Sequence, residues 1–129
     1  MAKAKKDTFE NSNVIYEFLC PCEEFYICQT GRTLETRADE HFKNDCSNIC
    51  THKQNCKIYK NDAKKFLKEN KKFIPDPLEA RYEHFKKKFK IIGKGFKTDH
   101  DRERTEAFRI RTNMPKINKQ TDQYAFRLF

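Results

Sequence analysis

Four residues in the first third of this chain carry side chains that could act on a phosphate group. Tyr16 and Tyr26 lie in two short apolar runs, and Arg37 and His41 follow four residues apart. In a helix this spacing places both side chains on one side, one turn apart. Arginine can bind phosphate oxygens with a bidentate fork, and histidine or a tyrosine hydroxyl can carry a proton. Together they indicate phosphate chemistry, although each one alone is better explained by packing or by a solvated ion pair.

The two tyrosines are expected on the strands of a β-hairpin. Residues 13–20 and 25–28 are rich in aromatic and β-branched side chains, and Pro21 marks the turn between them. If Leu19 pairs with Phe25, the alternation of side chains along a strand puts Tyr16 and Tyr26 on one face. The opposite face then carries four apolar side chains, those of Ile15, Leu19, Phe25 and Ile27.

Arg37 and His41 are expected on a helix over residues 33–44. Gly31 would break the preceding strand, and Thr33 is a suitable N-cap. The apolar stripe of this helix consists of Leu34, Ala38 and Phe42.

The later elements complete a small mixed fold. The predicted fold class is α/β (α+β), with a three-stranded antiparallel sheet flanked by helices. The pattern predicts a helix at 62–70, a helix opening near Pro77, a strand at 89–95 ended by glycines, and a helix at 98–112 with Thr98 and Asp101 spaced as a capping box.

Charge indicates the kind of partner. The chain has 129 residues, with 28 Lys and Arg against 19 Asp and Glu, a net charge of +9. This excess favours an anionic partner, most simply nucleic acid, and a merely soluble basic surface is the alternative. We expect a basic tail at 1–12 and one domain at 13–129, with a Lys- and Cys-rich peripheral insert at about 45–75.

The cysteines are expected to be reduced or bound to metal. No signal-like apolar run follows the first basic residues, so an intracellular location without membrane attachment is expected. The insert contains a C-x3-C-x-H-x3-C pattern whose side chains suit tetrahedral zinc, and free thiols are the alternative. Its members are Cys46, Cys50, His52 and Cys56, with His41, Cys20 and Cys22 as additional candidate ligands.

Several short motifs resemble those of GIY-YIG endonucleases. "VIY", then "YIC", then "QTGRTLETRADEH" resembles the family signature, in which two strands carry tyrosines and the next helix carries an essential arginine. "TGRTLETRADEH" is similar in particular to the GIY-YIG domains of Penelope-like retroelements. Further on, "RTEAFRI" resembles the helix with the metal-binding glutamate, and "PKINK" resembles the region of the terminal asparagine.

This resemblance implies a metal-dependent DNA endonuclease that hydrolyses phosphodiester bonds, nuclear if the source is a eukaryotic retroelement. It implies Mg²⁺ or Mn²⁺ held by Glu106, and substrate binding by Gly31, Arg32 and Asn118. The implied catalytic residues are Tyr16, Tyr26, Arg37, His41 and Glu106.

Two positions depart from the motif. Val14 stands at its first glycine and Cys28 at its second, where a Cβ could crowd the substrate. The alternative function is therefore a GIY-YIG-like module that binds DNA with little cleavage, with or without a structural zinc. From the residues alone, an exposed salt bridge of Glu106 to Arg102 or Arg109 is the alternative to a metal ligand.

Overall fold

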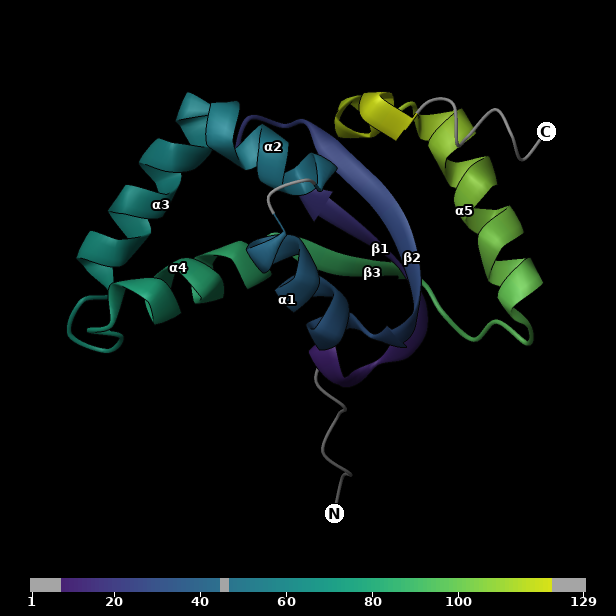
Figure 1. Ribbon diagram of the computed structural model, residues 1–129, viewed down its shortest axis with the longest axis horizontal. Coiled ribbons are helices and arrows are strands. Elements are labelled where there is room, and N and C mark those ends of the chain that lie inside the picture. The colour runs from purple at the N-terminus through teal and green to yellow at the C-terminus, as the bar shows by residue number, and fades with distance from the viewer. Residues whose placement is uncertain (1–7, 45–46, 122–129) are drawn as a thin grey trace, which may run out of the picture.

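A three-stranded antiparallel sheet forms the centre of the protein (Figure 1). The computed structural model describes residues 8–44 and 47–121. The strands are β1 (Ser12–Leu19), β2 (Phe25–Thr33) and β3 (Phe89–Gly93), in the order β2-β1-β3. With helices packed around this sheet, the structure confirms the predicted α+β class.

The register of the hairpin is the predicted one. Leu19 pairs with Phe25, and the next pairs on the other face are Phe18 with Tyr26 and Tyr16 with Cys28. Tyr16 and Tyr26 therefore lie on one face of the sheet, as expected.

Helices account for most of the remaining described residues. Side chains cap three of them as their sequences suggest: Thr33 accepts from Thr36 N–H, Asp76 from Leu78 N–H and Thr98 from Asp101 N–H. The α-helices are α1 (Leu34–Lys43), α2 (Asn48–Asn55), α3 (Lys57–Glu69), α4 (Pro77–Lys86) and α5 (Asp99–Asn113), with short 3₁₀ turns η1 (Thr8–Glu10) and η2 (Lys116–Thr121).

The secondary structure differs from the prediction in three places. Gly31 does not break β2, which continues to Thr33 because β1 reaches back to Ser12 and pairs with it. Helix α2, whose N-cap is Ser47, was not predicted. Helix α3 begins at Lys57 because the Cys56 thiol accepts from Tyr59 N–H and serves as a cap.

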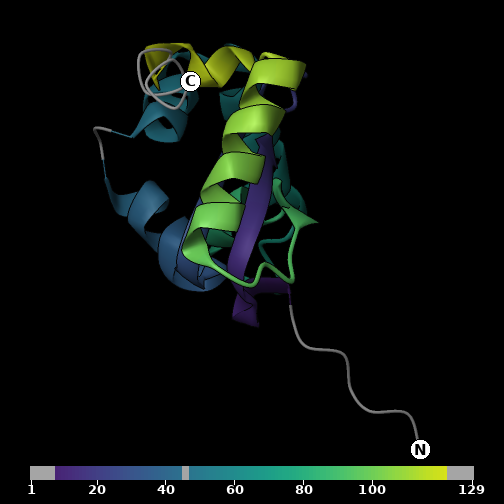
Figure 2. The same cartoon turned by 90° about the vertical axis from the view of Figure 1, so that its right-hand side faces the viewer.

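The two faces of the sheet have different cores. On the tyrosine face, Tyr16 and Phe18 pack with Phe85 of α4 and Phe89, and α1 adds Leu34 and Ala38. On the other face, Ile15 and Ile27 pack against Ile110 of α5, the helix that runs in front of the strands in Figure 2.

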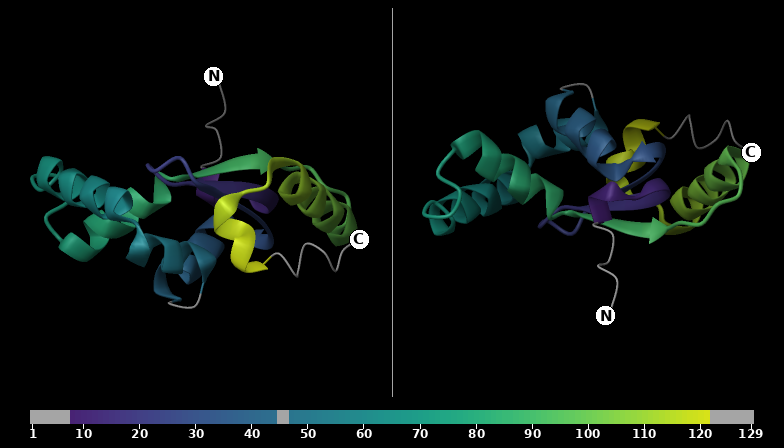
Figure 3. Two further views of the ribbon diagram at one scale, coloured as in Figure 1. Left: turned by 90° about the horizontal axis from the view of Figure 1, so that it is seen from above. Right: turned by 90° about the horizontal axis from the view of Figure 1, so that it is seen from below.

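The insert is less peripheral than expected. Helices α3 and α4 project from the end of the molecule opposite α5 (Figure 3), but Ile49 of α2 and Tyr59 of α3 are buried in the aromatic core. The insert therefore contributes to folding. Among the described residues, every helix is too short or too polar to cross a bilayer.

The hairpin register predicts a sharp contrast between two neighbouring substitutions. Phe18 is fully buried and Leu19 is 44% exposed. Phe18→Ala should lower the free energy of unfolding by about 3–5 kcal/mol, whereas Leu19→Ala should cost less than about 1 kcal/mol. Urea denaturation followed by circular dichroism measures both, and equal costs would contradict the register.

Candidate functional site

A pocket of about 430 Å³ opens beside β2, between α1, α5 and η2. Most of the residues predicted to act in catalysis or substrate binding line this pocket, together with Cys28 and Arg102. The predicted site residues that line it are Tyr26, Gly31, Arg32, Arg37, Glu106 and Asn118.

Tyr16 and His41 form a buried pair next to this pocket. The Tyr16 hydroxyl and His41 Nε2 are 2.7 Å apart, and both side chains are at most 2% exposed. Burial, assisted by the Arg37 charge, lowers the pKa of His41 to about 3, so the imidazole is neutral at physiological pH. It can accept a hydrogen bond from the Tyr16 hydroxyl, and neither side chain lines the pocket itself.

Burial also determines the state of the two tyrosines. It raises the pKa of Tyr16 and of Tyr26 well above the usual value, and the neighbouring Cys28 raises both further. The opposing effect of the Arg37 charge is smaller. Both hydroxyls therefore stay protonated at physiological pH.

Arg37 is oriented from α1 toward the pocket. Its Nη1 lies 3.5 Å from Glu40 Oε1, and the same carboxylate also pairs with Arg32. Burial by itself would lower the pKa of Arg37, but Tyr16, Cys28 and Tyr26 together raise it. The guanidinium is a permanent positive charge at the pocket wall.

Glu106 brings an unusual carboxylate to the same pocket from α5. Its side chain is 2% exposed, and its Oε1 has no hydrogen-bond partner among the described residues. Burial raises its pKa to about 7, against smaller lowering contributions from Cys28 and the Gln29 backbone. This buried carboxylate differs from the exposed salt bridge to Arg102 or Arg109, which was the alternative from the residues alone.

Arg102, one turn before Glu106, has other partners. Its Nη1 donates to Asn13 Oδ1 at 2.6 Å and to Asp99 Oδ1 at 2.9 Å, and its Nε donates to Gln29 Oε1. This buried guanidinium ties the start of α5 to both strands of the hairpin. Its position four residues before Glu106 was the only sequence signal for this role.

Asn118 supports the pocket from η2. Its Oδ1 accepts from Ile27 N–H at 2.8 Å and its Nδ2 donates to Ile27 O at 2.9 Å. Because β2 is an edge strand, the amide satisfies backbone groups that have no neighbouring strand. These bonds fix β2 to η2 at Ile27, the residue that precedes Cys28.

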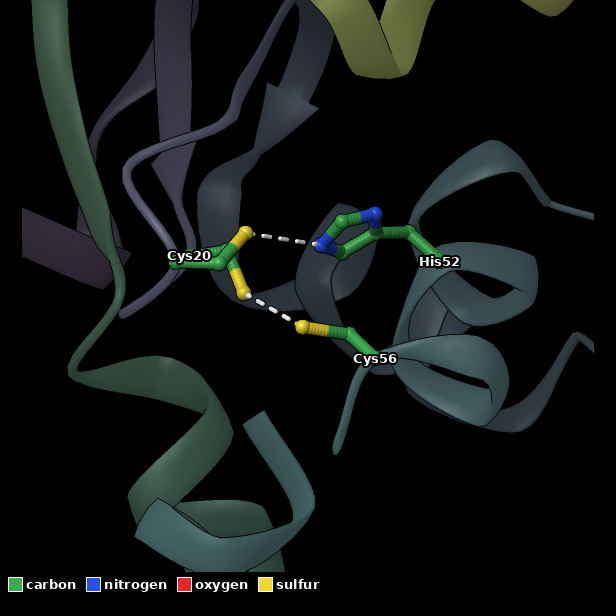
Figure 4. A group of neighbouring side chains, drawn as sticks. Cys20, His52 and Cys56 are labelled. Atoms are coloured by element: carbon green, nitrogen blue, oxygen red, sulfur yellow. Dashed lines mark hydrogen bonds between the residues drawn. The ribbon is translucent and has the colours of Figure 1, made fainter. Parts of the chain in front are cut away.

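A second group of side chains has the composition of a metal site. The ligand atoms of four residues lie within 4.8 Å of one another: Cys20, Cys22, His52 and Cys56. Figure 4 shows Cys20, His52 and Cys56 converging from the end of the hairpin and from α2. The Cys20 and Cys56 sulfurs are 3.8 Å apart, and Cys22 Sγ is 3.4 Å from His52 Nε2.

This cluster corrects the predicted ligand set. Cys50 is buried elsewhere and accepts from Gln54 Nε2, and Cys46 lies outside the described residues. His41 bonds to Tyr16 instead. Of the four residues in the insert pattern, His52 and Cys56 belong to the cluster. Cys20 and Cys22, which were predicted as additional ligands, complete it.

The surroundings of the cluster favour its role as a ligand set. His52 Nδ1 lies 3.9 Å from Glu24 Oε2, so the other ring nitrogen faces the thiols. The five described cysteines are free of disulfide bonds. Together, these four side chains form a candidate metal-binding cluster.

Comparison of the chain with protein-family models, curated proteins and solved structures finds no match. A functional conclusion therefore depends on the geometry of the pocket and of the cluster.

Glu106 should make the stability of the protein depend on pH. Its pKa is near 7 in the folded state and 4.5 is the usual value. The stability from this neutral carboxyl is complete below pH about 4.5 and lost as the pH rises through 7. At pH about 8, Glu106→Gln should be more stable than the wild type by up to about 3 kcal/mol.

Urea denaturation without divalent ions, from pH about 5 to 8, measures the free energy of unfolding of Glu106→Gln and of the wild type. The difference between these two values cancels the contributions of the other titratable groups. Glu79→Gln, at an exposed position on α4, is the control and should keep the wild-type dependence. A constant difference between Glu106→Gln and the wild type across this range would contradict the assignment.

Proposed function

We propose that the protein is a metal-dependent DNA endonuclease of the GIY-YIG type. The observation that supports this best is the meeting of Arg37, Tyr26 and Glu106 in one pocket, where the buried Glu106 carboxylate has one oxygen, Oε1, without a hydrogen-bond partner among the described residues. A buried carboxylate without a partner is costly unless it serves a ligand. Next to this pocket, the hydrogen-bonded pair of Tyr16 and His41 adds a hydroxyl and a neutral imidazole.

The pocket suits a divalent cation. The orphaned Glu106 oxygen is a hard anionic ligand of the kind that Mg²⁺ and Mn²⁺ prefer. When bound, such an ion would polarise a phosphate oxygen and stabilise the leaving oxygen.

The protein side chains would then divide the remaining work. Arg37 binds phosphate oxygens and stabilises negative charge that develops during the reaction. Tyr26 lines the pocket and orients the attacking water or the phosphate. His41 orients the Tyr16 hydroxyl, which can donate a hydrogen bond to the neutral imidazole over 2.7 Å.

Charge favours DNA as the substrate. Beyond the pocket, α3 carries five lysines, and a groove between α1, α3 and α4 contains Lys60, Lys64 and Arg81. Lysines on such a surface would neutralise backbone phosphates without reading sequence. The alternative is a module that binds DNA without cutting it. It is supported by the Cys28 side chain, which lines the pocket at the position of the second glycine of the motif.

Two substitutions test the enzyme. Glu106→Gln removes the proposed metal ligand and Arg37→Ala removes the proposed transition-state cation. Each should reduce Mg²⁺-dependent nicking of a plasmid by about 10²–10³-fold or more. Tyr16→Phe should be comparably harmful if the hydroxyl moves a proton, and nearly harmless if the ring only packs.

DNA binding is the control, since Glu106→Gln removes a negative charge and should leave it intact. Cys28→Gly should raise Mg²⁺-dependent cleavage if the thiol obstructs the site. Absence of cleavage by both the wild type and Cys28→Gly, with Mg²⁺ and with Mn²⁺, would leave the binding function in place of the nuclease.

We also propose that the cluster binds a structural zinc ion. Ligands about 2.3 Å from a tetrahedral zinc lie about 3.8 Å from one another. The Cys20 and Cys56 sulfurs have this separation, and the shorter contact of Cys22 with His52 matches the shorter bond to nitrogen. Such an ion would tie the turn of the hairpin to the insert.

Metal analysis after dialysis against a weak chelator should find one equivalent of tightly held zinc that the chelator does not remove. Cys22→Ser and His52→Ala should lose it and lower the Tm, because binding stabilises only the folded state. Cys50→Ser is the matched control within the insert and should retain the ion. Zinc-free wild-type protein, or loss of zinc from Cys50→Ser alone, would refute this ligand set.

A further inference from the structure

The thiol of Cys28 lies at the centre of the candidate active site. Cys28 is paired with Tyr16, so the two side chains leave the sheet on the same face, and Cys28 lines the pocket. Its thiol interacts with the Tyr16 and Tyr26 hydroxyls, with Arg37 and with Glu106. A sulfur and a carboxylate are therefore neighbours at the place where the proposed function requires a cation.

The carboxylate provides an independent sign of a ligand. Glu106 is 98% buried, and its Oε1 has no partner in the described part of the chain. The other polar groups nearby are occupied: the Asn118 amide holds Ile27 and Gln29 Oε1 accepts from Arg102. The Cys28 thiol donates to Gln29 O at 3.7 Å, a bond that is lost when the thiol gives up its proton. The resulting thiolate and the Glu106 Oε1 atom are then two protein ligands that can hold an ion in the pocket.

This donor pair differs from the hard carboxylate oxygen of Glu106 alone, which by itself would favour Mg²⁺ or Mn²⁺. Magnesium binds oxygen almost exclusively, whereas zinc and ions of similar softness accept thiolate and carboxylate together. We propose that Cys28 and Glu106 jointly bind a thiophilic divalent cation, with zinc as the natural type, and that Cys28 thereby determines which metal the site prefers.

Binding at this site is a ligand exchange without oxidation or reduction. The ion forms one bond to sulfur and one to the carboxylate, and the thiol proton passes to solvent. With only two protein ligands, the remaining coordination positions are open to water or to phosphate oxygens, as in catalytic metal sites. The inference rests on the proposed metal-binding role of Glu106, but it does not require that DNA be cut.

Cobalt absorption tests the pair without measuring activity. The protein is first loaded with one equivalent of zinc, which the four-residue cluster holds and which Co²⁺ does not displace, because zinc binds more tightly. Added Co²⁺ should then give a thiolate-to-cobalt charge-transfer band. Cys28→Ser and Glu106→Gln should each abolish this band, and Cys50→Ser should leave it unchanged.

Each other result overturns the proposal. A wild-type protein without the band, or a band that persists in Cys28→Ser, excludes the sulfur ligand, and a band retained by Glu106→Gln excludes the joint site. Circular dichroism checks folding, and Cys28→Gly serves as the second variant if Cys28→Ser does not fold.

The cobalt result is separable from the endonuclease proposal. A cobalt band, with no plasmid cleavage by the wild type or by Cys28→Gly in Mg²⁺ or Mn²⁺, would refute the nuclease and support the metal pair. Mg²⁺-dependent cleavage without a cobalt band would support the nuclease and refute the metal pair.

Discussion

The antiparallel pairing of β1 with β2 is the constraint on which both sites depend. Pairing Tyr16 with Cys28 places these two side chains, together with Tyr26, on the face covered by α1. A one-residue slip of β1 against β2 would turn Tyr16 to the opposite face, away from Tyr26 and Cys28, and replace it with Ile15. The aromatic core prevents this slip, because Phe18 would also leave its packed position against Phe85 and Phe89.

The edge position of β2 explains how a carboxylate can be buried in the pocket. Because no strand follows β2 in the sheet, α5 and η2 can approach its outer side. Arg102 fixes α5 to Gln29 and Asn13, and Asn118 fixes η2 to Ile27. With its helix held on this side, Glu106 remains desolvated although its charge is unfavourable there. Retaining such a group costs stability, as is usual for residues kept for binding or catalysis.

Local sequence patterns predicted the parts of the fold that local physics determines. Alternation in the hairpin gave the correct register, and the Thr33 and Thr98 caps gave correct starts of α1 and α5. The long-range features were less accessible. The end of β2 depends on how far β1 extends, and the cap of α3 is a cysteine thiol, a group that cap preferences do not include.

The difference between local and long-range features also applies to the four residues of the candidate metal-binding cluster. The insert supplies His52 and Cys56 one helical turn apart, a local signal that sequence reasoning could detect. The other two ligands flank Pro21 in the hairpin turn, about thirty residues away, and only the docking of α2 against that turn brings them in. Spacing within the insert therefore favoured Cys50, whose side chain the helix directs into the core.

The cluster and the pocket are two ends of one hairpin. Cys20 directly follows β1, whose middle residue Tyr16 lies beside the pocket, and Cys22 belongs to the turn that leads into β2. A zinc ion at the cluster would close the loop between the turn and α2, and thereby restrict the unfolded chain as a cross-link does. It would also restrain both strands at the end where they separate. Because register is shared along the whole hairpin, zinc held by the cluster would help to keep Tyr16, Tyr26 and Cys28 aligned at the pocket, without contacting any of them.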